Sequence, residues 1–182
     1  MELGFFIIIT LKDYLKILLK NPLNSFLVMI LRTHILFAVL VDVILGFHVN
    51  FFTILGSTLP DVDLPSTSFG QTFNRLSKYL FRRFGHRGLC HSVYWSLLFG
   101  ALSFINKDVF LQLCIGYTAH IFLDMFNPTG VKLFYPWNVN FTMFDGAVET
   151  GKRKDNIIAI VSIVIACLII LYRGGFFGFL TS

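Results

Sequence analysis

Long apolar runs make up most of this sequence, and they limit the folds that the chain can adopt more than any other feature. Of its 182 residues, 55% are hydrophobic and 14% are charged, whereas about 25% of the residues in an ordinary soluble domain are charged. In lipid every backbone N–H and C=O group must be hydrogen-bonded within the protein, as it is in a helix. The composition therefore predicts an all-α integral membrane protein.

The positive charge of the chain is consistent with the lipid bilayer as its partner. The formal net charge is +5, and Lys and Arg residues beside apolar segments attract anionic lipid head groups and set the orientation in the membrane. We therefore do not infer a nucleic-acid partner. Cys90, Cys114 and Cys167 lie far apart among apolar neighbours, and without Cys-x-x-Cys spacing they are interpreted as small buried hydrophobic residues.

Four apolar runs in the middle of the chain are predicted to form a bundle of helices joined up and down. They cover residues 33–46, 50–59, 91–105 and 109–126. A further run from Asn156 to Tyr172 contains 17 residues without a charge, which is about 25 Å of helix and suits a transmembrane segment. The chain is accordingly divided into an N-terminal extension of residues 1–28, a core of residues 29–137, and a loop with a C-terminal transmembrane helix in residues 138–182.

The N-terminal extension is predicted to be an amphipathic helix at the membrane interface. Lys12, Lys16 and Lys20 recur every four residues, so they share one helix face and can contact lipid head groups. The apolar residues precede the basic ones and no small-residue cleavage site follows, which argues against a secretory signal peptide.

Seven His and Asp residues are candidate metal ligands because the predicted topology brings them to one end of the bundle. They lie at the start of the first and third helices and at the end of the second and fourth. Polar residues scattered by chance would fall at both ends. The set is His34, Asp61, Asp63, His86, His91, His120 and Asp124.

Each member of the set also has an interpretation without a metal. His120 and Asp124 share one helix face because they are four residues apart. They can therefore bind one ion, or Asp124 can orient His120, or the two can form a buried polar pair. Asp61 and Asp63 can chelate an ion, bridge two ions or cap a loop. His34 by itself would be an ordinary core histidine.

Three further polar residues are interpreted separately from this set. Arg87 lies between two of the histidines, and its guanidinium matches a phosphate or a carboxylate, although a basic loop residue can also serve only to set topology. Asp42 is a lone acid in the middle of a predicted helix and is interpreted as structural. His48 is expected at the opposite end of the bundle and is left out of the site.

Four motifs in this order resemble the YdjM-like family of inner-membrane proteins. They are RTHILF (Arg32 to Phe37), LPDVD (Leu59 to Asp63), FGHRGLCHS (Phe84 to Ser92) and GYTAHIFLDMFNPTGV (Gly116 to Val131). The resemblance covers about residues 29–137, and all seven candidate ligands match it. Cys90 replaces a Thr that is usual in the family, and Leu64 stands where a His often follows. Neither change removes a candidate ligand.

The resemblance implies a metal-dependent hydrolase, because the family is classed so and is regarded as distantly related to zinc-dependent phospholipase C. Zinc is the first choice for mixed imidazole and carboxylate ligands, with manganese or iron as alternatives. Asp63 is then expected to take a proton from a metal-activated water and Arg87 to stabilise a phosphoryl oxygen. A phosphoester or phospholipid substrate follows from the resemblance alone. The alternative is a non-enzymatic multi-pass membrane protein with a structural metal site or with a transport or regulatory role.

The distribution of basic residues predicts that the site faces the cytoplasm. Residues 73–87 contain five basic residues and no acid, and residues 132–154 add four more, whereas the turn at residues 106–108 has only Lys107 beside Asp108. Short cytoplasmic loops are enriched in Lys and Arg. We therefore expect a multi-pass protein of the cytoplasmic (inner) membrane, with the metal site inside and the C-terminus outside.

Overall fold

The structure is a computed structural model that describes residues 25–48 and 50–144 and scattered positions between 154 and 172. The predicted interfacial helix of residues 1–28 lies almost wholly outside this part of the chain. The run from Asn156 to Tyr172 is described only in part, and its described positions are helical.

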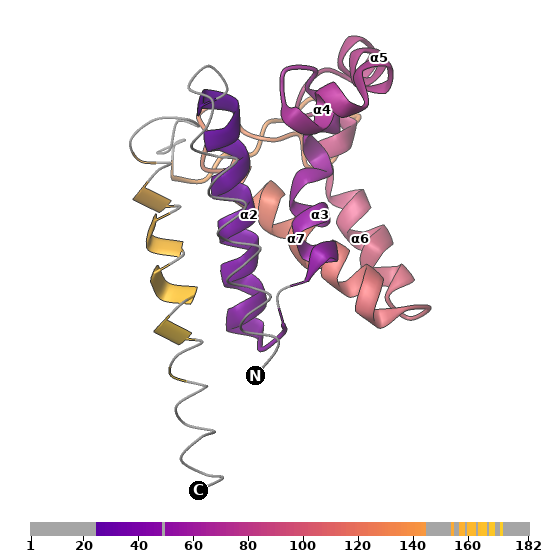
Figure 1. Cartoon of the computed structure of the whole chain (residues 1–182). Coiled ribbons are helices and arrows are strands. Elements are labelled where there is room, and N and C mark those ends of the chain that lie inside the picture. The colour runs from indigo at the N-terminus through magenta and orange to yellow at the C-terminus, as the bar shows by residue number, and fades with distance from the viewer. Residues whose placement is uncertain are drawn as a thin grey trace, which may run out of the picture.

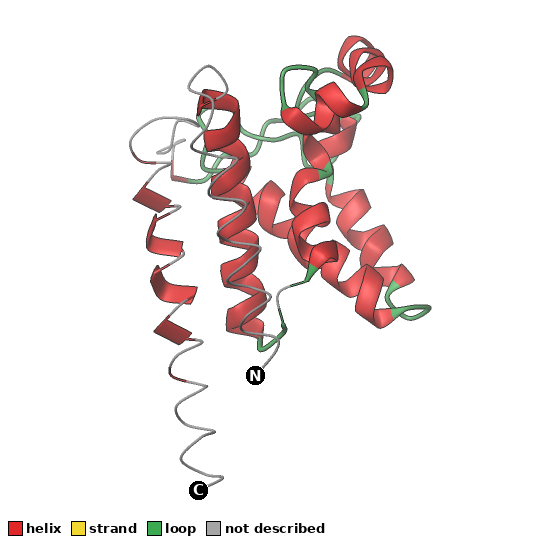
Figure 2. Ribbon diagram, viewed as in Figure 1, coloured by secondary structure: helices red, strands yellow, loops and turns green. Residues whose placement is uncertain are grey.

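Every regular element among the described residues is a helix (Figure 2), which confirms the predicted all-α class. Short 3₁₀ helices are labelled η. Among the described residues, no helix combines the length and the apolar character that crossing a membrane requires. In chain order the elements are α2 (Ser25–Leu45), α3 (Phe51–Thr58), η2 (Pro60–Asp63), α4 (Ser68–Thr72), α5 (Asn74–Phe84), η3 (Leu89–His91), α6 (Val93–Leu102) and α7 (Lys107–Asp124).

The helices α2, α3, α6 and α7 correspond to the four predicted apolar runs and run alternately up and down (Figure 1). Helix α7 lies among the other three and contacts each of them. Helix α2 begins earlier than predicted, at Ser25, because the residues before the predicted start are themselves mostly apolar. On its outer side, Leu40 and Val43 of α2 pack against Ala166 of the C-terminal run.

Two asparagines define where α3 and α7 begin, at the same end of the bundle. The Asn50 side chain accepts hydrogen bonds from the backbone N–H groups of Phe52 and Thr53, at 2.8 and 3.1 Å. Asn106 caps α7 in the same way by accepting from the Val109 N–H at 3.2 Å. Such caps satisfy N–H groups that have no partner within the helix. The cap at Asn50 shows that the predicted turn before α3 exists, and the up-and-down order depends on that turn.

The closest helix crossing in the bundle is between α3 and α7, and two glycines make it possible. A Cβ atom added to Gly116 would lie 2.1 Å from the Thr53 carbonyl oxygen, and one added to Gly56 would lie 2.5 Å from the Leu113 carbonyl oxygen. No larger residue fits at either position without moving a backbone. Small residues of this kind allow helices to approach closely in membrane proteins.

Polar side chains are buried inside the bundle, whereas large apolar side chains are exposed on it. The fully buried Asp42 accepts a hydrogen bond from the Thr53 hydroxyl. The Gln112 amide, with its nitrogen turned toward the carboxylate, donates to Asp42 Oδ1 at 2.9 Å. On the outside, Phe104 and Leu97 are 94% and 64% exposed. Asp42, interpreted as structural from the sequence, thus has polar partners on both α3 and α7.

Candidate metal centre

Two carboxylates of the site, Asp61 and Asp63, lie where α3 gives way to a short 3₁₀ helix. Pro60 begins η2, which ends the α-helix and turns Asp61 and Asp63 into the protein. Thr67 holds this turn in place because its hydroxyl donates to the backbone carbonyls of Asp61 and Leu64, at 2.9 and 2.8 Å. The same two carbonyls also accept backbone N–H bonds, from Leu64 and Thr67, so the turn is held by side chain and backbone together.

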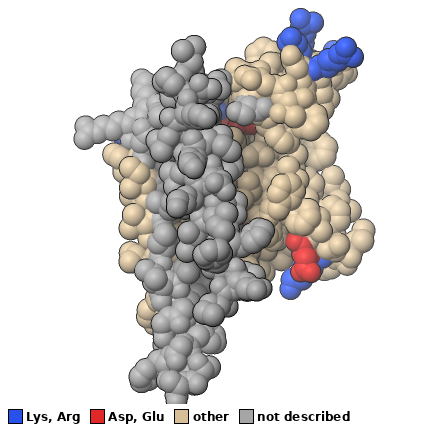
Figure 3. Space-filling view, viewed as in Figure 1, with Lys and Arg blue, Asp and Glu red and all other residues tan. Residues whose placement is uncertain are grey.

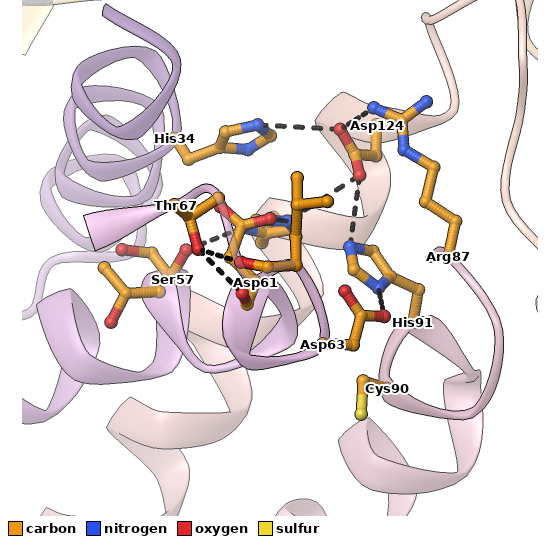
Figure 4. A network of polar contacts seen from close by, with 12 residues as sticks. His34, Ser57, Asp61, Asp63, Thr67, Arg87, Cys90, His91 and Asp124 are labelled. Atoms are coloured by element: carbon orange, nitrogen blue, oxygen red, sulfur yellow. Dashed lines mark hydrogen bonds and ion pairs between the residues drawn. The ribbon is translucent and has the colours of Figure 1, made fainter. Parts of the chain in front are cut away.

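The structure brings the seven candidate ligands together, as the predicted topology required. Figure 4 shows His34, Asp61, Asp63, His91 and Asp124 of this set. Six of them are buried, and His86 is half-buried. His48 is exposed beyond the far end of α2, apart from this cluster. Three overlapping groups have ligand atoms that all lie within 4.8 Å of one another, and these are His34 with His120 and Asp124, Asp61 with His91 and His120, and Asp63 with His86 and His91.

Three contacts in the inner part of the cluster have separations similar to those between the ligands of a tetrahedral metal ion. Asp124 Oδ2 lies 3.3 Å from His91 Nε2 and 3.7 Å from His120 Nε2, and His120 Nε2 lies 3.8 Å from Asp61 Oδ1. Ligand atoms about 2.0–2.2 Å from a tetrahedral zinc are about 3.3–3.6 Å apart. These three separations are close to those between ligands of one ion, whereas Asp61 and Asp124 belong to different groups of mutually close atoms.

The same atoms lack ordinary partners, which is a second sign that the cluster suits a cation. Nε2 of His91, Nε2 of His120 and Oδ2 of Asp61 are buried, and none has a hydrogen-bond partner in the described part of the chain. Buried polar atoms are nearly always hydrogen-bonded. A metal bound at these atoms would satisfy all three.

In His91 and His120, the contacts of Nδ1 leave Nε2 available for a metal ion. His120 Nδ1 lies 2.6 Å from the Ser57 carbonyl oxygen. A carbonyl only accepts, so Nδ1 carries the proton and Nε2 carries the lone pair. His91 Nδ1 lies 3.2 Å from Asp63 Oδ2. Bonds of this kind orient metal-binding histidines and raise their basicity.

Asp63 has contacts that differ from the role expected of it. One of its oxygens faces His91, and the other lies 2.7 Å from His86 Nδ1. Both oxygens are therefore occupied by imidazole rings. These contacts favour a carboxylate that orients two histidines over one that binds the ion or accepts a proton from water.

Arg87 likewise contacts protein groups on both sides of its guanidinium. Its Nη2 donates to Asp124 Oδ1 at 2.8 Å, and its Nη1 donates to the Thr129 hydroxyl. Arg87 also has a positive φ of 60°, a conformation that few residues other than glycine adopt. To contact a phosphoryl oxygen as expected, the Arg87 guanidinium would have to give up one of these two hydrogen bonds.

His34 completes the inner side of the cluster from α2. Its ring stacks on the His120 ring with the centroids 3.9 Å apart, and its Nε2 lies 3.5 Å from Asp124 Oδ1. Asp124 thus faces His34 with one oxygen and His91 with the other, whereas His120 and His91 are the residues that the overlapping groups share. His34 can join the first ion or help to hold a second.

Charge interactions decide the protonation of the loop residues. Burial opposes ionisation of Asp63, but the adjacent His91 and His86 outweigh it and lower its pKa to about 2. Burial also disfavours charge on His91, but Asp63 and Asp124 outweigh that effect and raise its pKa to about 10. A cation and a proton therefore compete for the His91 ring. Burial, together with Asp63, raises the pKa of Cys90 to about 12, so its thiol stays protonated and is a poor metal ligand.

One important contact of the site has no signal in the sequence. The group that orients His120 is the backbone carbonyl of Ser57, which any residue at that position would supply. Only the close crossing of α3 and α7 at Gly116 brings it within hydrogen-bond distance. Thr67 was also missed, although a Thr shortly after the LPDVD motif is a usual residue for capping a turn.

Comparison with known proteins identifies the family. A family model described as YdjM inner membrane protein matches residues 29–177. The chain belongs to the YdjM inner membrane protein family. This confirms the resemblance indicated by the four motifs, whereas the relationship to phospholipase C stays a prediction. No solved structure matches this fold at a significant level.

Individual curated proteins are moderately similar to the chain. Inner membrane protein YdjM of Escherichia coli (strain K12) and its namesake in Shigella flexneri are each 32% identical over 127 residues, which are 64% of this chain and 64% of the relative. Uncharacterized protein YvsG of Bacillus subtilis (strain 168) is 28% identical over 107 residues, covering 57% of this chain and 66% of the relative. The chain therefore spans about two thirds of the length of these relatives.

Proposed function

We propose that this protein is a metal-dependent hydrolase of the inner membrane that acts on a phosphoester, with a phospholipid as the natural candidate. The observation that carries the proposal is the pair of buried Nε2 atoms of His91 and His120, which have no hydrogen-bond partner among the described residues and face the carboxylates of Asp61 and Asp124. The family name supports the membrane location. The exposed apolar side chains of the bundle support it independently, because lipid is the solvent in which they are stable.

The proposed ligands of one ion are Asp61, His91 and His120, with Asp124 and His34 beside them. Imidazole and carboxylate donors suit zinc first and also manganese or iron. When bound, such an ion supplies Lewis acidity and lowers the pKa of a water molecule toward neutrality. The division of the chain into residues 1–28, 29–137 and 138–182 is a separate prediction.

The other charged residues of the site are proposed to hold and balance it. Asp63 fixes the rings of His86 and His91 through their Nδ1 atoms, so that the lone pair of His91 Nε2 faces the ion. Arg87 holds Asp124 and places a positive charge beside it. A phosphoryl oxygen that replaced Thr129 as a partner of Arg87 would be stabilised by the same guanidinium.

A structural metal site is the second candidate, because the inner ligands are almost completely buried. The side chains of His91 and His120 have no measurable exposure, and that of Asp124 is 4% exposed. Structural metal sites are closed, whereas catalytic ones keep a position open for substrate. His86, with 27% of its side chain exposed, is the ligand candidate nearest to solvent.

Metal analysis tests the centre. Full-length protein purified in detergent is expected to contain a transition metal, and His91→Ala or His120→Ala should lose at least about 90% of it because each supplies a ligand atom. His48→Ala, at the other end of the bundle, is the matched control and should keep the wild-type content. His86→Ala separates the groups, because it should retain most of the metal if the ion lies at the inner atoms. Equal metal in the wild type and both inner variants would refute the site.

Activity measurements separate the two candidate functions. Metal-loaded wild type is expected to hydrolyse a generic phosphodiester such as bis(p-nitrophenyl) phosphate, and His120→Ala should reduce the rate to background. If the wild type binds metal and unfolds at a lower temperature after chelation but cleaves no phosphodiester or phospholipid, the structural role is correct instead.

The orientation in the membrane is a separate expectation. Multi-pass crossing with the site on the cytoplasmic side predicts that a reporter fused in the loop near Ala147 reads as cytoplasmic and one after Ser182 as external. The physical reason is the excess of basic residues around the site end of the bundle. An external reading at Ala147 would reverse the orientation and require a substrate outside the cytoplasm.

A further inference from the structure

Helix α5 lies at the site end of the bundle and carries a strongly basic surface. Arg75, Lys78, Arg82 and Arg83 are all exposed. Together with Tyr79 they line a shallow hollow on α5. In the described part of the chain no carboxylate pairs with any of the four. Figure 3 shows Lys and Arg gathered on this part of the visible face, with no Asp or Glu beside them.

The basic residues occupy the side of α5 that points away from the protein. Arg75, Lys78 and Arg82 follow the spacing i, i+3 and i+7, which places them on one helix face. Ser77, which lies on the opposite face, is completely buried, and α5 packs against η2 and α4. In the described part of the chain the basic face is therefore exposed and accessible to a partner.

The position of α5 favours a flat anionic partner. The helix lies across the end of the bundle, whereas α2 and α7 run along its length (Figure 1). If the bundle helices stand along the membrane normal, α5 lies parallel to the membrane surface. Phe73, Leu76 and Phe81 flank the basic face and are 44–49% exposed. Basic residues flanked by apolar ones are typical of helices that lie at the boundary between lipid head groups and acyl chains.

We infer that α5 binds the phosphate groups of anionic phospholipids and holds the site end of the bundle at the level of the head groups. The chain continues from the C-terminal end of α5 through Gly85 into His86 and Arg87 of the candidate centre. Each Lys or Arg near an anionic membrane surface adds a favourable electrostatic contribution. The inference needs the membrane location in the proposed function but not the metal or the hydrolase activity.

Lipid retention tests this inference with the full-length protein. The protein is placed in nanodiscs of equimolar phosphatidylglycerol and phosphatidylcholine. It is then released from the nanodiscs, and the lipids that remain bound to it are counted by native mass spectrometry. Wild type is expected to retain phosphatidylglycerol in excess. Arg75→Gln combined with Arg82→Gln should reduce that preference about tenfold or more, because two charges are lost. Lys107→Gln, at the other end of the bundle, should leave it unchanged.

Further variants separate the effect of charge on α5 from the effects of side-chain shape and of the metal centre. Arg75→Lys with Arg82→Lys keeps both charges and should keep the preference, and a loss there would overturn the inference because the charge would not be the cause. His120→Ala should also keep the preference, so that failure of the metal centre is distinguishable from failure of α5. The inference is overturned if wild type shows no preference for phosphatidylglycerol. It is equally overturned if the α5 residues instead bind duplex DNA or RNA.

Discussion

Replacement of Asp124 by Ala is expected to produce the largest loss of stability of any single change at the site. Asp124 accepts a hydrogen bond from Arg87 at 2.8 Å and lies within 3.3–3.7 Å of His34, His91 and His120. Removing one partner of a buried ion pair typically costs about 3–5 kcal/mol, because the other charge remains buried without compensation. The thermal unfolding midpoint of the detergent-purified protein should fall accordingly, and the metal should be lost.

Asp108→Ala is the matched control for this prediction. Asp108 lies in the first turn of the same helix, α7, and is exposed. Its loss removes only a favourable interaction with the helix dipole, worth about 0.3–1 kcal/mol. Asp124→Asn adds a second comparison, since it keeps the shape of the side chain while removing its charge. Equal unfolding midpoints for Asp124→Ala and Asp108→Ala would contradict a stabilising role for the network.

Gly116→Ala is expected to damage the metal centre without changing any residue that belongs to it. The new methyl group would lie 2.1 Å from the Thr53 carbonyl oxygen and 2.9 Å from the Ser57 backbone nitrogen, so α3 has to move away from α7. Overpacking of this kind costs about 1–3 kcal/mol. The shift also moves the Ser57 carbonyl from His120 Nδ1. Loss of such an orienting bond typically weakens metal affinity about 10–100-fold.

Gly100→Ala is the control that shows whether the effect of Gly116→Ala is specific to the crossing of α3 and α7. A Cβ atom at Gly100, on α6, would meet only Cys114 Sγ at 3.7 Å, which is an ordinary contact. Alanine is also the better helix former by about 1 kcal/mol. Gly100→Ala should therefore unfold at or above the wild-type temperature and bind metal normally. Wild-type metal affinity in Gly116→Ala would show that the close crossing does not position His120.

Much of the candidate site follows from local sequence patterns. The spacing of four residues between His120 and Asp124 places them on one face of any helix that contains them. The order of apolar runs and turns then predicts that the His and Asp residues of different helices meet at one end. Both arguments use only helix periodicity and the direction of the chain, which are properties of short segments.

The roles within the site depend on contacts between helices, which no local pattern specifies. Asp63 was expected to act as a base and Arg87 to contact substrate, yet each is paired with protein groups, Asp63 with His86 and His91, and Arg87 with Asp124. A pattern shows that a carboxylate is near, but the direction in which its oxygens point depends on how η2 and η3 fold together.

The sequence by itself therefore determined the helical class, the family and the set of residues that converge. The tertiary structure decided which nitrogen of each histidine is available and which carboxylates face it. The physical reason is that hydrogen bonds such as the one from His120 to the Ser57 carbonyl require two backbones to approach within a fraction of an ångström of the right distance. That approach depends on how α3 and α7 pack at Gly56 and Gly116.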